Sequence, residues 1–122
     1  MIVIRRLTFI TWLILAITGC EKNPVQTRVD ADLQRGKIAL AQYACHSCHV
    51  IPGITGSKVF IGPTLDGIAQ RPMIAGKLPN NTANLIAWIR DPKRIDPQTA
   101  MPNMGVTEEH ARQITAYLLT LK

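Results

Sequence analysis

The chain has 122 residues, which bounds it to one domain, and 47% of them are hydrophobic. It contains only two Phe, two Tyr and two Trp, so a core built from side chains alone would be small, and a large buried cofactor would supply much of the missing apolar area. The formal net charge is +6, but the basic residues are scattered and no aromatic residues alternate with them. This pattern argues against nucleic-acid binding and favours docking to an acidic protein surface.

The N-terminal residues resemble an export signal. Two arginines precede an apolar run over residues 7–17, which is shorter than the about 20 residues of a membrane-spanning helix. The run ends in Ile17-Thr18-Gly19-Cys20, which resembles a bacterial lipoprotein signal. The resemblance implies that residues 1–19 are removed and that Cys20 receives a diacylglycerol, which would anchor the protein on the periplasmic side of a bacterial membrane. An uncleaved signal anchor is the alternative.

Residues 20–29 are polar, contain one proline and are predicted to form a tether, followed by a domain over residues 30–122. We expect the first helix to begin near Asp30 or Asp32, because acidic residues cap helices and favour their first turn. Four small or apolar residues then recur at helical spacing: Leu33, Gly36, Leu40 and Ala44.

The next segment, residues 51–76, is rich in Gly and Pro and is predicted to be mostly loop, with one short helix around residues 65–70. Asn81 and Thr82 are suited to cap a second helix, which should end before Pro92.

The last part of the chain predicts a loop and then a helix. Residues 92–104 hold three prolines and should form an extended loop. Thr107 is expected to cap a final helix with Glu108 and Glu109 in its first turn. Loops of this length are unusual in a domain built of protein alone, but they make sense if they wrap a flat cofactor.

The strongest chemical signal is Cys45-His46-Ser47-Cys48-His49, which has the C-x-x-C-H spacing of c-type haem attachment. Two thiols must reach the two vinyl groups of one porphyrin while the adjacent imidazole reaches the iron, and this spacing satisfies both requirements. A zinc site would normally need a second pair of ligands, and only His110 remains outside the motif. A thiol redox pair would need a βαβ context, which the sequence lacks. We therefore expect one covalent haem c with His49 as an iron ligand.

A second pattern resembles the class I cytochromes c. The run Pro92-Lys93-Arg94-Ile95-Asp96-Pro97-Gln98-Thr99-Ala100-Met101 is similar to the family's P-K-x-x-x-P-x-T-x-M, whose closing methionine binds iron. With the attachment motif, Gly62-Pro63 and the last helix, the resemblance covers nearly all of residues 30–121. It implies an all-α fold of a few helices and long loops around one haem, with Met101 as the second axial ligand. Met104 is the alternative ligand. Otherwise two methionines are expected to fill the core: Met73 and Met104.

The same resemblance implies roles for four further residues. The carbonyl group of Pro63 should accept a hydrogen bond from the His49 ring and fix its tautomer. Arg71 should lie near a haem propionate or in solvent, and Trp88 should lie beside the methionine ligand or simply in the core. Thr99 should form a hydrogen bond either to a propionate or within a turn.

Three other positions carry structural predictions. The resemblance implies that the first and last helices cross closely at a small residue. Gly36, packed against Tyr117 and Leu118, would fit this role, which would explain a glycine in a helix. His46 and His110 are expected to be solvated rather than to bind the iron.

The resemblance implies a one-electron carrier of a respiratory chain, not an enzyme, which passes electrons between a dehydrogenase or quinol-oxidising complex and a terminal oxidase. The alternatives are a dedicated subunit of a larger membrane complex and an open-site haem sensor or peroxidase. We expect redox protein partners with acidic docking surfaces and a membrane reached through the lipid. The docking surface should include Lys93 and Arg94, together with basic residues of the loops expected around the haem: Lys58, Arg71 and Lys77. Neither nucleic acid nor a small-molecule substrate is expected.

Overall fold

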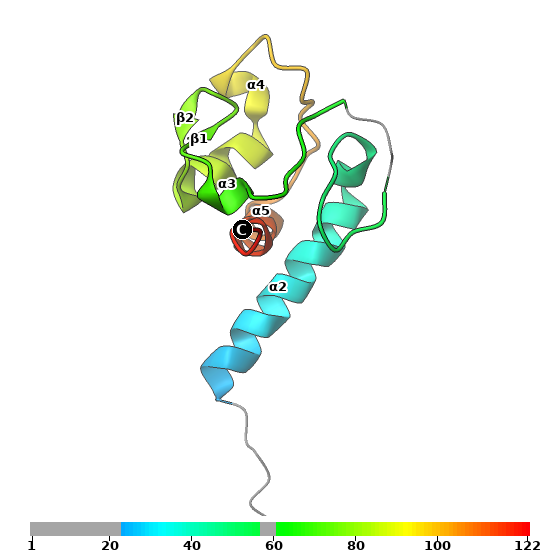
Figure 1. Cartoon of the computed structure of the whole chain (residues 1–122), viewed down its shortest axis with the longest axis vertical. Coiled ribbons are helices and arrows are strands. Elements are labelled where there is room, and N and C mark those ends of the chain that lie inside the picture. Colours follow the sequence, from blue (N-terminus) through cyan, green and yellow to red (C-terminus); the bar gives the residue numbers. More distant parts are fainter. Residues whose placement is uncertain (1–22, 57–60) are drawn as a thin grey trace, which may run out of the picture.

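The computed structural model describes residues 23–56 and 61–122, and the predicted signal peptide, Cys20 and Lys58 lie outside these residues. The described part is mostly helical (Figure 1). Its elements are α2 (Pro24–Gln42), the 3-10 turns η2 (Cys45–Ser47) and η3 (Ile68–Gln70), the strands β1 (Met73–Ile74) and β2 (Leu78–Pro79), α3 (Thr82–Arg90), α4 (Pro92–Ile95) and α5 (Glu108–Leu118). None of the helices in this part of the chain combines the length and the hydrophobicity needed to cross a membrane.

The crossing of α2 and α5 organises the domain. Figure 1 shows α5 almost end-on beside the C-terminal half of α2. A Cβ atom added to Gly36 would lie 2.6 Å from the backbone carbonyl carbon of Gln113 and 3.1 Å from Cβ of Tyr117. The close crossing at Gly36 is therefore confirmed for Tyr117. The nearest neighbour is the backbone of Gln113, which was not predicted.

The start of α2 differs from the prediction. The helix begins at Pro24 and not near Asp30, so most of the predicted tether is helical. The side chain of Asn23 accepts a hydrogen bond from the backbone N–H of Val25 at 3.0 Å. Proline is favoured at the first helical position, where its missing N–H would have had no partner. Residues 23–30 are all exposed, and this end of α2 extends away from the rest of the domain (Figure 1).

The starts of the later helices follow local capping. Asn81 caps α3 as predicted and accepts a hydrogen bond from the backbone N–H of Asn84 at 2.9 Å. Thr107 caps α5 in the same way. The prediction of an extended loop over residues 92–104 is wrong for its first four residues, which form α4. Asp91 caps that turn and Pro92 takes its first helical position, which repeats the arrangement at α2.

The segment between η2 and α3 is mostly loop, as expected, but it also contains a hairpin that the sequence pattern did not predict. β1 and β2 pair antiparallel, with Ile74 opposite Leu78. Ala75 and Gly76 have φ values of 50° and 66°, which suits the tight turn of a short hairpin. The predicted short helix around residues 65–70 is reduced to the 3-10 turn η3.

The core joins α2, α3 and α5 with the loops between them. Its buried hydrophobic residues are Ala39, Leu40, Ile51, Ile68, Ile74, Leu85, Trp88, Ile89, Val106, Ala111, Ile114 and Leu118. Trp88 is the one aromatic side chain in this set, which agrees with the low aromatic content of the sequence.

Candidate functional site

The attachment motif folds into a compact turn directly after α2. Ala44 adopts a left-handed conformation with φ of 52°, which turns the chain away from the helix. The backbone N–H groups of Cys48 and His49 both donate to the carbonyl oxygen of Cys45, at 3.3 and 3.0 Å. The turn brings the side chains of Cys45, Cys48 and His49 to one cavity. Burial raises the pKa of the Cys45 thiol, so this group meets the apolar cavity in its neutral form.

The His49 ring is held from two sides. Its Nδ1 lies 2.7 Å from the carbonyl oxygen of Pro63. A carbonyl group only accepts hydrogen bonds, so Nδ1 carries the proton and Nε2 keeps its lone pair for a metal. A Cβ atom on Gly62 would lie 2.7 Å from Nδ1 and 3.0 Å from Nε2, so the ring packs against a position that has room only for glycine.

Two backbone hydrogen bonds bind the segment that follows Gly62 to the attachment motif. The N–H of Gly62 donates to the carbonyl oxygen of Cys48, and the N–H of Leu65 donates to that of Val50, both at 2.8 Å. Because Pro63 lies between these bonds, its carbonyl group is held next to the His49 ring.

The cavity has a volume of about 520 Å³ and is lined mainly by apolar side chains. Leu40 from α2, Trp88 from α3 and Ile114 from α5 contribute to its walls. A volume of this size is typical of cofactor sites. It holds two thiols for thioether bonds, one imidazole with a free Nε2 and an apolar lining, and this donor set fits haem c.

Three methionines line the same cavity: Met73, Met101 and Met104. Met101 is partly buried, whereas the side chains of Met73 and Met104 are 41% and 40% exposed. Met73 and Met104 are therefore not part of the buried core of side chains and border the cavity instead. Since both Met101 and Met104 border the cavity, the assignment of Met101 as the axial ligand remains a prediction from the family resemblance.

The other predicted site residues also border the cavity. Trp88 is buried at 8% exposure and belongs to both the core and the cavity wall. The hydroxyl oxygen of Thr99 accepts a hydrogen bond from the backbone N–H of Met101 at 3.2 Å, which is the turn interaction considered for it. One guanidinium nitrogen of Arg71 donates to two backbone carbonyl groups, those of Thr64 at 2.6 Å and Asp66 at 2.7 Å. The guanidinium group is therefore not simply solvated.

The two remaining histidines are more enclosed than predicted. The Nδ1 atom of His110 lies 2.9 Å from the hydroxyl oxygen of Tyr43, and the two rings meet edge-on with centroids 5.6 Å apart. Tyr43 also lines the cavity, so this pair connects α5 to the cavity wall. His46 is half-buried, and its Nδ1 is buried without a hydrogen-bond partner among the described residues. No spacing in the sequence indicated the contact between Tyr43 and His110, because the residues are 67 positions apart.

The described residues contain no cluster of three His, Cys, Asp or Glu side chains that could hold a metal ion.

Comparisons with known proteins identify the family. The family model of cytochrome c matches residues 33–122. Cytochrome c oxidase subunit 2 of Alkalihalophilus pseudofirmus (strain ATCC BAA-2126 / JCM 17055 / OF4) is 37% identical over 89 residues, which cover 72% of this chain and 25% of the relative. Cytochrome c oxidase subunit 2 of Bacillus sp. (strain PS3) is 32% identical over 105 residues, which cover 83% of this chain and 29% of the relative. The chain thus spans between a quarter and a third of the length of these curated relatives. No solved structure matches it significantly.

The matched region includes the attachment turn, most of the residues that line the cavity, and α5. It confirms the expected mostly helical class I fold and the covalent haem c cofactor, with Cys45 and Cys48 at the positions of the attachment cysteines. The chain belongs to the cytochrome c family, whose members are electron-transfer proteins.

Proposed function

We propose that this protein is a one-electron carrier of a respiratory chain, which passes electrons between a dehydrogenase or quinol-oxidising complex and a terminal oxidase. The supporting observation is that Cys45, Cys48, His49 and Met101 line one apolar cavity. A bound haem c supplies a reversible one-electron couple. His49 would supply a fixed imidazole and Met101 a thioether to its iron, which would leave no coordination position for a substrate. The thioether and the apolar lining both favour the ferrous state over the more highly charged ferric state.

The ligand assignment is tested with two matched variants. Met101→Ala should abolish the ferric iron–thioether absorbance and lower the reduction potential, because the soft ligand is lost. Met104→Ala changes a methionine at the border of the same cavity and should leave both properties as in the wild type. The reverse result would move the ligand to Met104.

An open-site haem sensor or peroxidase is the alternative from another functional class. It requires the Met101 thioether to leave the iron. Carbon monoxide binding to the ferrous protein distinguishes the two functions, because a six-coordinate carrier binds this ligand slowly and weakly. Rapid and tight binding by the wild type would support the sensor or peroxidase.

A dedicated subunit of a larger complex is the nearer alternative, and the relatives provide the reason to consider it. Both are cytochrome c oxidase subunit 2, and this chain matches only part of each. A free carrier should elute as a monomer after mild detergent extraction of membranes. A dedicated subunit should elute with a haem-containing oxidase activity.

The lipid anchor at Cys20 and the periplasmic location are also part of the proposal. They rest on the signal-like sequence of residues 1–19 and on the cysteine that follows it. Intact mass measurement of the purified protein should show a diacylglycerol, and Cys20→Ser should release haem-loaded protein or leave it unprocessed. A wild-type mass without acyl chains would refute lipidation.

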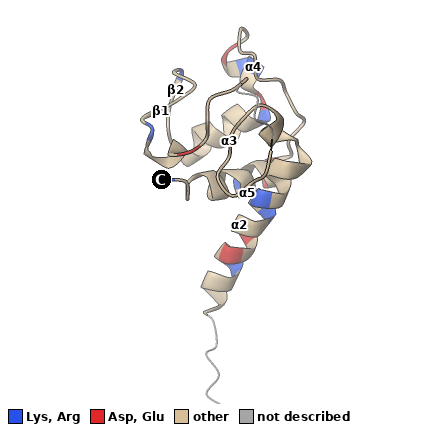
Figure 2. Ribbon diagram, turned by 45° about the vertical axis from the view of Figure 1, so that its right-hand side comes forward, with Lys and Arg blue, Asp and Glu red and all other residues tan. Residues whose placement is uncertain are grey.

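Docking to acidic partner surfaces is supported only in part by the charges around α4. Figure 2 shows basic residues distributed over α2, α4 and the hairpin rather than gathered in one patch. The Nζ atom of Lys93 donates to the carbonyl oxygen of Thr99 at 3.1 Å, and Lys77 forms an ion pair with Asp96 at 3.6 Å. Charge reversal at Lys93 and Arg94 should slow association with a redox partner and flatten its salt dependence without changing the haem spectrum. A rate that is indifferent to both salt and charge reversal would mean that these residues only solubilise the protein.

A further inference from the structure

We propose that Arg71 and Asn80 are positioning residues for the axial histidine, and we call them the loop clamp. They hold the segment of residues 62–66 whose Pro63 carbonyl group orients the His49 ring. The inference rests on the proposed ligation of iron by His49. It gives Arg71 a role through the protein backbone rather than through a haem propionate.

The first part of the loop clamp is the guanidinium group of Arg71. One nitrogen donates to the carbonyl oxygens of Thr64 and Asp66, at 2.6 and 2.7 Å. Hydrogen bonds donated by a charged group to backbone carbonyls are stronger than neutral ones. Arg71 therefore ties together two carbonyl groups that follow Pro63 in the chain.

The bond to Thr64 has a specific geometric effect. The carbonyl group of Thr64 and the N–H of Leu65 belong to the same planar peptide. The N–H donates to the carbonyl oxygen of Val50 at 2.8 Å, while the carbonyl oxygen accepts from Arg71 at 2.6 Å. This peptide is therefore held at both edges and cannot rotate freely. Because proline fixes its own φ, little freedom remains for the carbonyl group of Pro63.

The second part of the loop clamp is the side-chain amide of Asn80, which fixes Arg71. Its Nδ2 donates to the carbonyl oxygens of Ile68 at 2.7 Å and Arg71 at 2.8 Å. The backbone N–H of Asn80 donates to the carbonyl oxygen of Pro72 at 2.9 Å. Since an amide nitrogen has two protons, both of its donors are used. Asn80 thus fastens the backbone on both sides of Arg71 and sets the point from which the guanidinium group reaches the loop.

Substitution of Asn80 can distinguish a positioning role of the loop clamp from a direct effect of a side chain on the cofactor. Arg71 lines the cavity, so a change there could act through the haem itself, whereas Asn80 is not one of the lining residues. An effect of Asn80 on the iron must therefore pass through the backbone. A second side-chain amide, that of Gln113, is also buried outside the cavity lining, and its Nε2 donates to Glu109 within α5 at 3.1 Å, with no bond to residues 62–80. Gln113 is the matched control.

The experiment uses the haem-loaded protein and two measurements. In the ferrous, diamagnetic state, NMR measures the exchange rate of the His49 Nδ1 proton with solvent. Asn80→Ala should raise this rate at least about fivefold, as expected when a hydrogen bond of ordinary strength is loosened. The reduction potential should rise as well, because a weaker bond to Pro63 makes the imidazole less basic and a poorer partner for ferric iron. Arg71→Gln should also raise the exchange rate, whereas its potential additionally reflects the loss of a positive charge at the cavity wall and is not used for the comparison.

Gln113→Ala should leave the exchange rate and the potential at their wild-type values. Equal shifts in Asn80→Ala and Gln113→Ala would mean general loosening of the domain and would overturn the proposal, as would a fully loaded Asn80→Ala protein identical to the wild type. If Asn80→Ala cannot be loaded with haem, the test uses Arg71→Gln instead. An unchanged exchange rate of the His49 Nδ1 proton in Arg71→Gln would then refute the loop clamp. A wild-type spectrum without a histidine on the iron would instead refute the proposed function itself.

Discussion

Substitution of Gly36 by alanine tests how strongly the domain depends on the close crossing of α2 and α5. The added Cβ would lie 2.6 Å from the carbonyl carbon of Gln113, whereas two carbon atoms in ordinary contact are about 3.5 Å or more apart. The neighbouring atom is backbone and the next is Cβ of Tyr117, so no side-chain rotation can relieve the overlap. The helices must separate by roughly 1 Å, which loosens the buried side chains Leu40 and Ile114 beside the crossing.

Two effects oppose each other in this variant. Alanine in place of glycine favours a helix by about 1 kcal/mol. Overpacking of a rigid contact destabilises by about 1–3 kcal/mol, and a backbone neighbour places this site in the upper half of that range. We therefore expect Gly36→Ala to lower the free energy of unfolding by about 1–2 kcal/mol net.

The assay is denaturant and thermal unfolding of the oxidised, haem-loaded protein. For a domain of this size, the expected loss corresponds to a fall in Tm of about 4–8 °C per kcal/mol. Gln34→Ala, an exposed position on the same helix, is the control and should be neutral or slightly stabilising. If Gly36→Ala were as stable as the wild type or more stable, helix propensity would dominate and the crossing would not be rigid.

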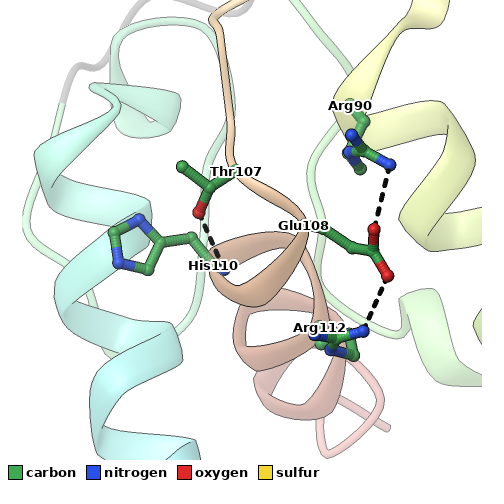
Figure 3. A network of polar contacts seen from close by, with 5 residues as sticks. All are labelled: Arg90, Thr107, Glu108, His110 and Arg112. Carbon is green, nitrogen blue, oxygen red and sulfur yellow. Dashed lines mark hydrogen bonds and ion pairs between the residues drawn. The ribbon is translucent and has the colours of Figure 1, made fainter.

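Three further predictions concern hydrogen bonds and contacts near the cavity. Gly62→Ala should displace the ring of His49, because the new Cβ would lie 2.7 Å from its Nδ1; an unchanged ferric absorbance and haem content would contradict this. Tyr43→Phe should remove the 2.9 Å hydrogen bond to His110 and lower stability by about 0.5–1.5 kcal/mol in urea unfolding, while a gain in stability would show that the hydroxyl group is better solvated than paired. Thr107→Ala should remove the α5 cap shown in Figure 3 and lower stability by about 1 kcal/mol. Hydrogen exchange should then be faster at the His110 amide, and an amide that exchanges as in the wild type would argue against the cap.

Glu108, in the first turn of α5, forms ion pairs with two arginines (Figure 3). Glu108 lies 2.7 Å from Arg112 and 3.5 Å from Arg90, so it connects α5 with the end of α3 (Figure 3). All three side chains are largely exposed, and surface pairs of this kind contribute little to stability. The buried crossing at Gly36, and not this charged group, should therefore dominate the stability of the domain.

Short-range signals made much of the fold predictable. Asn81 and Thr107 are capping residues whose partners lie three positions away, and both helix starts were predicted from the sequence. Pro24 and Pro92 were misinterpreted for one reason. Proline ends a helix when it is internal but is favourable at the first position, and a preceding Asn or Asp is what distinguishes the two cases.

Two parts of the candidate site could be predicted from the sequence: functional groups that lie close together in the chain, and residues that match the family's motifs. The attachment motif places three functional groups within five residues, so its spacing carries the information. The bonds from Arg71 and Asn80 end on backbone carbonyl groups, which every residue possesses. Because no residue type identifies a backbone acceptor, the sequence could not predict these hydrogen bonds, and they are found only in the three-dimensional structure.

The exposed first turns of α2 have a consequence for how far the domain can move. Residues 24–30 are all exposed, so uncoiling them would break the backbone hydrogen bonds of these turns and the side-chain bond between Gln26 and Asp30, and would leave the core intact. As helix these seven residues span about 10 Å, and fully extended they span about 24 Å. This segment can therefore act as an extensible spacer, with roughly 14 Å of additional reach between the haem-binding body and any attachment that precedes Asn23. If the proposed lipid on Cys20 anchors the chain, this spacer would let the domain approach partners at different heights above the membrane without changing the geometry around His49.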